Sequence, residues 1–411
     1  MNIPLKIGLI SYRSNPHCGG QGVYIRHLSH ALSAFGNHVE VIAGPPDPLL
    51  NQTVNLTMLK TLDLYNPDDL FRTPSLAELK DPINLLEWLD VSFMGFPEPF
   101  TFGMRVKRHL KENAKRFDIL HDNQSLSYGI LSLAKKMPVT ATIHHPMTVD
   151  RRLAIKDAPS FIQKIKAIRW YSFIGMQKRV AQRLSHLITV SDSSKKDIAK
   201  EFNIPESRFK TIPIGIDTHN FFPIETIQKE PDRIIVTNSA DTPLKGLAYL
   251  LTAIKLVLKI RKVKLVVVGA SKKGGTIERL VKTLEIGPYI RFTGRIDHGQ
   301  FVKEYAKASI AVIPSLYEGF GLPVGEAMAC RIPVICTTGG ALPEVAGDAA
   351  MLVPPADATA LKDAILELLD NPTLREDLAQ KGYNRVLQEF TWEKTALKTI
   401  EAYKAAIHDY H

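Results

Sequence analysis

The chain has 411 residues, 45% of them hydrophobic, and a net charge of +10 with a pI near 9.3. This length exceeds what one hydrophobic core usually organises, so we expect two domains. No apolar run reaches the ~18 residues of a spanning helix, and the three cysteines lack metal-pair spacing, so we expect a cytoplasmic protein without a metal site. The charge favours anionic partners, but no nucleic-acid motif accompanies it, and we expect no nucleic-acid binding.

Short apolar runs alternate with longer amphipathic stretches, a pattern that predicts an α/β fold with parallel, doubly wound sheets. A segment rich in proline, glycine and charge at 212–232 separates two sets of strands, and the helical segment 392–410 follows the second set. We therefore place one domain at 1–215 and a second at 216–390. The predicted strands are 6–12, 38–43, 118–121, 139–144, 186–191 and 209–214, then 233–238, 264–270, 290–293, 310–314, 333–337 and 350–353.

Ligands of open α/β sheets bind beyond the carboxyl ends of strands, so the loops after strands hold the candidate residues. The first loop contains Gly19 and Gly20 before an amphipathic helix, where bare backbone can approach a phosphate. It lacks the last glycine of a dinucleotide fingerprint, and a simple tight turn remains the alternative. His144 ends a later strand, where an imidazole can bond a sugar hydroxyl or have a purely structural role.

The loop after the strand 310–314 contains two carboxylates, Glu318 and Glu326, separated by glycines and Pro323. Pro323 suits the first position of a helix, so Glu326 is expected in its first turn. Carboxylates bind vicinal hydroxyls, which makes sugar and ribose natural ligands. The intervening residues offer backbone amides for phosphate or hydroxyl contacts, and they are Gly319, Phe320, Gly321 and Leu322.

Two basic features complete the candidates. Lys245 follows the first strand of the second domain, where an ammonium group can neutralise a diphosphate leaving group. The segment 151–183 carries nine lysines and arginines against one acid, interleaved with aromatic residues. As a basic amphipathic helix it would lie on an anionic membrane surface, and as a core helix it would merely expose its charges to water.

Together these residues resemble family 4 of the retaining glycosyltransferases, known as glycosyl transferases group 1. The resemblance runs nearly end to end and is strongest from 264 to 389, in the order Phe292-Thr-Gly294, Pro314-Ser-Leu-Tyr-Glu318-Gly-Phe-Gly-Leu-Pro323, Pro333-Val and Gly339-Gly-Ala-Leu-Pro-Glu344. It implies the GT-B fold, in which two Rossmann-like domains face each other across a cleft. It also implies that the C-terminal helix, 391–411, crosses back to the first domain.

The resemblance assigns roles to matching positions. Glu318 would face the donor hexose, Glu326 would hold the ribose hydroxyls, and Lys245 would clamp the diphosphate. His144 would lie near the transferred sugar, and Gly19 with Gly20 would approach the diphosphate from the first domain. The family's arginine before the lysine is missing, because Ser239 or Ala240 stands in its place, and Arg295 is the candidate substitute.

The expected function is therefore transfer of a hexose, with retention, from a nucleoside diphosphate sugar to a hydroxyl of a glycan, lipid-linked or small-molecule acceptor. UDP-glucose is the first expectation for the donor and GDP-mannose the second, and no cofactor or metal is expected. The alternatives are a nucleotide-sugar epimerase or phosphorylase of the same fold and a catalytically silent nucleotide-sugar binder. The segment 151–183 would place the protein peripherally on the inner face of the membrane.

Overall fold

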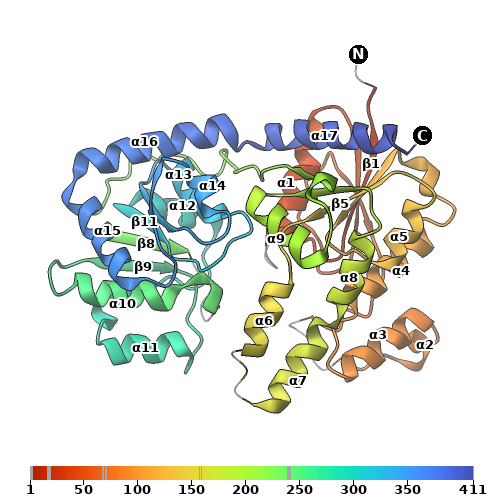
Figure 1. The fold of residues 1–411 in the computed structure, drawn as a ribbon, viewed down its shortest axis with the longest axis horizontal. Helices are drawn as coiled ribbons and strands as arrows, with labels where there is room; N and C mark the ends of the chain where they lie inside the picture. Colours follow the sequence, from red (N-terminus) through yellow and green to blue (C-terminus); the bar gives the residue numbers. More distant parts are fainter. Residues whose placement is uncertain are drawn as a thin grey trace. The chain divides into compact units, whose positions relative to one another are not determined.

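The structure is a computed structural model that describes residues 3–15, 20–66, 69, 72–156, 158, 160–237 and 242–410. The chain forms two compact units, one of residues 1–212 with 395–411 and one of residues 213–394 (Figure 1). The boundaries expected from the sequence, after 215 and after 390, differ from these by a few residues. Each unit contains a parallel sheet covered by helices, so the predicted α/β fold with two Rossmann-like domains is confirmed.

The first unit is organised by a parallel sheet whose order, over the described residues, is β3-β2-β1-β4-β5-β6-β7. Its central strands are buried along their length, and β4 and β5 are buried at every residue, because helices cover both faces of the sheet. The short strand β3 was missed from the sequence, since half of its residues are exposed. The strands are β1 (Lys6–Ser11), β2 (His38–Ala43), β3 (Asn55–Met58), β4 (Ile119–Asn123), β5 (Val139–Ile143), β6 (His186–Thr189) and β7 (Phe209–Thr211).

The helices of the first unit lie between these strands in the chain. An insert after β3 adds α2 and α3 before α4. They are α1 (Gly20–Ala34), α2 (Leu76–Leu79), α3 (Pro82–Ser92), α4 (Glu98–His109), α5 (Tyr128–Ala134), α6 (Thr148–Lys156), α7 (Phe161–Trp170), α8 (Ile174–Ala181) and α9 (Asp192–Phe202).

The C-terminal helix α17 (Trp392–His408) packs on the first unit through a buried hydrogen bond. The hydroxyl of Tyr403 lies 2.6 Å from Nδ1 of His121 on β4, and both side chains are buried. Burial lowers the pKa of His121 to about 3, so the ring is neutral in this contact. The expected return of the last helix to the first domain is confirmed.

The second unit repeats the arrangement with a parallel sheet ordered β10-β9-β8-β11-β12-β13 in its described part. Its strands are β8 (Arg233–Thr237), β9 (Lys264–Val268), β10 (Ile290–Phe292), β11 (Ile310–Ile313), β12 (Val334–Thr337) and β13 (Ala350–Val353). Its helices are α10 (Leu247–Val257), α11 (Thr276–Leu284), α12 (His298–Ala306), α13 (Leu322–Ala329), α14 (Leu342–Ala346), α15 (Ala358–Asp370) and α16 (Pro372–Glu389).

The segment 151–183 does not form one helix, contrary to both readings of the sequence. It contains the end of α6, all of α7 and α8, and a 3-10 turn at Tyr171–Phe173. Helix α8 buries Ile174, Met176 and Val180 in the core, whereas α7 has no buried residue. The segment therefore combines a helix that packs in the core, α8, with a helix that lies exposed, α7.

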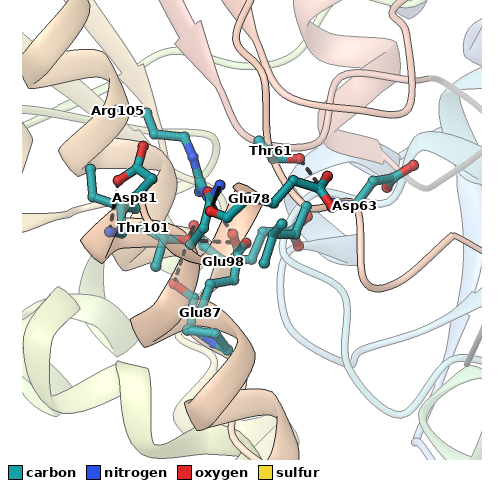
Figure 2. Close-up of polar contacts among 12 residues, drawn as sticks. Thr61, Asp63, Glu78, Asp81, Glu87, Glu98, Thr101 and Arg105 are labelled. Carbon is teal, nitrogen blue, oxygen red and sulfur yellow. Dashed lines mark hydrogen bonds and ion pairs between the residues drawn. The ribbon is translucent and has the colours of Figure 1, made fainter. Parts of the chain in front are cut away.

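A buried charged cluster joins α3 to α4 in the first unit (Figure 2). Arg105 pairs with Glu87 at 2.5 Å, the side chains are only 7% and 4% exposed, and Thr101 also contacts Glu87. Glu98 pairs with Arg13 at 2.7 Å, yet burial raises its pKa to about 7 despite this partner. The cluster fixes the insert against the sheet with side-chain contacts that the sequence pattern did not reveal.

Among the residues that the structure describes, no helix has the length and apolar character that crossing a membrane requires.

Candidate functional site

In the second unit, the strand order reverses direction between β8 and β11. Strands β9 and β10 lie on one side of this pair and β12 and β13 on the other. Loops that leave two adjacent strands in opposite directions open a crevice at the carboxyl edge, which is where open α/β sheets bind ligands. Lys245 lies on the loop after β8 and Glu318 on the loop after β11, so the strand order brings these two predicted residues together.

The two side chains form an ion pair. Nζ of Lys245 lies 2.7 Å from Oε1 of Glu318, and the hydroxyl of Ser315 donates to the same oxygen at 2.8 Å. The side chain of Lys245 is 32% exposed and that of Glu318 is 12% exposed. The ammonium group is therefore positioned by the carboxylate but still open to a ligand.

A glycine permits this approach of the two loops. Gly246 has φ +67°, and a Cβ atom there would lie 1.9 Å from the carbonyl oxygen of Pro314 at the end of β11. The amide of Leu316 donates to the carbonyl of Leu244 at 2.7 Å, which joins the loops through the backbone. A side chain at 246 would separate Lys245 from Glu318.

A pair of glycines holds Glu318 from the other side. The amide of Ala341 donates to the carbonyl oxygen of Glu318 at 2.9 Å, next to the turn at Gly339 and Gly340. Gly340 has φ +65°, and a Cβ atom there would lie 2.3 Å from that same oxygen. The conformation of the Glu318 loop thus depends on a motif that lies some 20 residues further along the chain.

The loop from Gly319 to Leu322 turns into α13. Gly321 has φ +101°, in a region that side-chain-bearing residues rarely adopt, and Leu322 is the first residue of the helix. Phe320 is buried, with its ring packed edge-on at 5.7 Å from that of Phe390. Its side chain therefore anchors the loop, and only the backbone of this stretch is a candidate for ligand contact.

Glu326 lies on α13 just beyond its first turn, because the helix begins at Leu322 and not at Pro323. Burial raises the pKa of its carboxyl to about 7, the Lys245 ammonium acts in the opposite direction, and Asp217 adds to the rise. A carboxyl group whose pKa is raised by burial to about 7 and that lies near a lysine is typical of a binding or catalytic site.

Arg295 is exposed on the loop after β10. Strand β9 separates β10 from β8, so this loop is not the neighbour of the Lys245 loop. Ser239 and Ala240, where the family's arginine is missing, lie outside the described residues, as does Gly19. The substitution of Arg295 for that arginine stays a prediction.

In the first unit, His144 directly follows β5 and is held by two residues from the end of β4. Its Nε2 lies 2.8 Å from Oδ1 of Asn123, and its amide donates to Oε1 of Gln124 at 2.7 Å. The amide nitrogen of Asn123 donates to the hydroxyl of Ser11 at 3.2 Å, which directs the Asn123 oxygen toward the ring. The Nε2 of His144 is therefore the protonated nitrogen.

The imidazole of His144 is neutral. Burial lowers its pKa to about 3, and the neighbouring His145 and His121 add to the effect. The ring of Tyr24 packs edge-on at 4.8 Å between centroids. A neutral ring with Nε2 as donor presents Nδ1 as an acceptor, which suits the hydroxyl of a sugar.

Gly20 begins α1 beside the same cluster. A Cβ atom at Gly20 would meet no atom within 4 Å. The side-chain amide of Asn123 lies 3.4 Å from the carbonyl of Gln21, which links this terminus to β4. Strands β1 and β4 are the reversal point of the first sheet, so the first unit also has a candidate site there.

Sequence reasoning missed the residues that orient the predicted ones. Asn123 and Gln124 position His144, Ser315 binds Glu318, and Asp217 acts on Glu326. A run of polar residues at the end of β4 and in the loop after it, His121 to Ser125, was the available signal for the first two. The described residues include no group of three or more histidines, cysteines or acids arranged to hold a metal ion.

Comparison with known proteins identifies the family. The family described as Glycosyltransferase Family 4 matches residues 18–220, and Glycosyl transferases group 1 matches residues 219–385. A protein of Mycolicibacterium hassiacum named MMP alpha-(1->4)-mannosyltransferase is 41% identical over 408 residues, which are 98% of both chains. The chain belongs to the family 4 glycosyltransferases. It is accordingly an enzyme that transfers sugar, as the resemblance implied.

Other relatives of this glycosyltransferase agree on the fold and the class. The sucrose-phosphate synthase of Thermosynechococcus elongatus superposes with a TM-score of 0.75 at 25% identity, covering 98% of this chain and 99% of that one. A Corynebacterium glutamicum protein, named GDP-mannose-dependent monoacylated alpha-(1-6)-phosphatidylinositol monomannoside mannosyltransferase, is 30% identical over 45% of this chain and 53% of its own length. The GT-B fold of this glycosyltransferase is therefore confirmed.

Proposed function

We propose that this glycosyltransferase transfers mannose from GDP-mannose to a hydroxyl of a glycan acceptor, with retention at the anomeric carbon. The support is the 41% identity over nearly the whole of both chains to a protein named as an alpha-(1->4)-mannosyltransferase. The name of the C. glutamicum relative, which specifies GDP-mannose, points to the same donor. This order reverses the expectation from the sequence, which placed UDP-glucose first.

The donor would lie at the β8/β11 crevice. Glu326 would accept hydrogen bonds from the ribose hydroxyls, and Glu318 would bind the hexose. Lys245 would turn from Glu318 toward the diphosphate, a movement that its 32% exposure allows. The backbone amides of Gly19 and Gly20 are proposed to bind the diphosphate.

The proposed chemistry is a same-face displacement. The bond from the anomeric carbon to the phosphate oxygen breaks, the acceptor oxygen bonds to that carbon, and the acceptor proton passes to the departing phosphate oxygen of GDP. Glu318 is engaged by Lys245 and Ser315, which favours a binding role for it over nucleophilic attack. Lys245 stabilises the negative charge that develops on the leaving group.

The roles proposed for the first unit follow from its hydrogen bonds. His144 would accept a hydrogen bond from a hydroxyl of the transferred sugar at Nδ1, since Asn123 engages Nε2. We propose no metal or other cofactor, and addition of a chelator is therefore expected to leave turnover unchanged.

A binding panel followed by product analysis tests the proposal. Thermal shift with GDP, UDP, GDP-mannose and UDP-glucose is expected to show the largest stabilisation with the guanosine ligands, because ligand binding shifts stability by mass action. Incubation with GDP-mannose and short mannosides, analysed by NMR, is expected to give a new α-linked mannose. Stabilisation by uridine ligands alone, with no response to guanosine ligands, would refute the donor assignment.

The same assay separates the remaining candidates. An epimerase converts the sugar without acceptor and releases no nucleotide, and a phosphorylase requires phosphate. Tight donor binding without turnover over a broad acceptor panel would identify a silent binder.

We also propose that the enzyme acts at the surface of an anionic membrane, through part of the segment 151–183.

A further inference from the structure

Two helices of the first unit, α3 and α7, expose large apolar side chains that no part of the described chain covers. Of the 22 exposed large hydrophobic residues in the described chain, ten belong to α3, α7 and the residues that adjoin them. Phe161 and Ile162 on α7 are 76% and 65% exposed, and Phe93 at the end of α3 is 66% exposed. Apolar patches of this kind on a folded chain mark a surface that binds a partner.

Helix α7 is amphipathic, with an apolar face that lies between two lysines. With ~100° between successive residues, Phe161, Ile162, Ile165 and Ile168 share one face, and Lys164 and Lys166 flank that face on its two sides. The opposite side carries Trp170, which stacks on Phe96 at 4.8 Å and so attaches the helix to the domain. The four side chains of the apolar face are nevertheless 44–76% exposed.

Arg169 joins the two helices into one surface. Its Nε donates to the carbonyl of Phe93 at 3.2 Å, and its guanidinium pairs with Asp90 on α3. Beside this contact lies an apolar groove of about 490 Å³, lined mainly by Pro82, Leu85, Leu86, Leu89 and Phe93. Figure 1 shows α3 and α7 at the same end of the first unit.

The charges around this surface select the partner. Helix α7 has Lys164, Lys166 and Arg169 and no acid, and the one acid in the groove, Asp90, is neutralised by Arg169. Lysines at the edges of an apolar face can extend their ammonium groups to lipid phosphates while their stems cover apolar surface. A basic, apolar-faced helix with this order of side chains is typical of an interfacial helix.

We propose that α3 and α7 form a docking surface for the headgroup region of an anionic phospholipid bilayer. The apolar face of α7 and the groove of α3 enter the boundary between headgroups and acyl chains, and Lys164 and Lys166 bind lipid phosphates. The role of this surface rests on the proposed function, because membrane binding would bring the first unit to acceptors at a membrane. Its test measures binding alone, so it can fail while sugar transfer stands.

Vesicle flotation of the full chain tests the surface. Binding to vesicles of phosphatidylglycerol and phosphatidylcholine is expected to exceed binding to phosphatidylcholine alone, and to weaken as salt shortens the Debye length. The double variant Lys164→Glu/Lys166→Glu is expected to lower the partition coefficient by about fivefold or more for each lysine. Phe161→Ser/Ile165→Ser is expected to lower it by about tenfold or more, through lost apolar burial.

The matched control is Ile260→Ser/Lys262→Glu, which changes an exposed isoleucine and an exposed lysine on the second unit. It is expected to bind vesicles as the unchanged protein does. Equal loss in the control and the α7 variants, or no binding of the unchanged protein to anionic vesicles, would overturn the proposal. So would a concentration-dependent dimer that the α7 variants abolish, because a second copy would then cover this face. A cooperative urea unfolding transition of each variant, followed by circular dichroism, verifies folding.

Discussion

Replacing Lys245 with alanine separates a catalytic role for the Lys245–Glu318 pair from a structural one. The pair lies at 2.7 Å, but the lysine side chain is 32% exposed, so solvent screens much of its attraction. An ion pair in such a setting contributes about 0–1 kcal/mol to stability. If Lys245 stabilises the leaving diphosphate, its loss should cost ~2.7–4 kcal/mol in the transition state, or ~10²–10³-fold in kcat.

We therefore expect Lys245→Ala to unfold at nearly the same urea concentration as the unchanged enzyme and to lose most of its turnover with GDP-mannose. Glu318→Gln keeps the shape of its side chain but removes the charge that positions the lysine. If each residue acts directly on the donor, the double variant should be slower than either single variant. The assay is release of GDP in the presence of acceptor, with kcat and KM determined separately.

Lys255→Ala is the control, because Lys255 is also a partly exposed lysine of the second unit with a long contact, 3.9 Å, to Glu285. Its kcat should be unchanged. The reasoning is refuted if Lys245→Ala keeps kcat within about fivefold of the unchanged enzyme, far below the loss expected for a transition-state contact. A stability loss of several kcal/mol would instead show that the pair is structural.

Three further predictions concern other groups. Because the folded-state pKa of Glu326, about 7, lies above the ordinary value of 4.5 for a glutamate, the protein should lose stability as pH rises through this interval. Urea unfolding measured from pH 5 to 8 should show a smaller loss of stability for Glu326→Gln than for the unchanged protein. Part of the loss should remain in the variant, because burial also raises the pKa of Glu98 to about 7. An equal loss in the two proteins would contradict the burial argument for Glu326. Asn123→Ala should lower kcat by about tenfold or more, because His144 loses the partner that fixes its tautomer. Asn123→Asp keeps an acceptor oxygen and should be less impaired. Equal rates in the two variants would show that Asn123 does not act by fixing the tautomer of His144. Arg105→Met should destabilise the first unit by about 3–5 kcal/mol, because it leaves the Glu87 carboxylate buried without its ion-pair partner. In calorimetry, the double variant Glu87→Gln/Arg105→Met should recover part of that loss. A mild effect of Arg105→Met alone would show that water reaches Glu87.

The sequence by itself determined the fold class and most strand positions, because each parallel strand must be apolar enough to be buried on both faces. It also singled out Lys245, Glu318 and Glu326, since charged residues and glycines directly after apolar strands have few structural reasons to be there. The family followed from the order of these motifs. The segment 151–183 defeated this reasoning, because basic composition does not distinguish the buried α8 from the exposed α7.

Only the tertiary structure decided which of these residues meet. Lys245 and Glu318 are 73 positions apart in the sequence, and they form an ion pair because β8 and β11 are neighbours at the reversal of the sheet. The protonation of His144 depends in the same way on Asn123, which β4 places beside β5. Periodicity reports the environment of a residue along one element, whereas these contacts depend on strand order, which arises from the packing of the whole sheet.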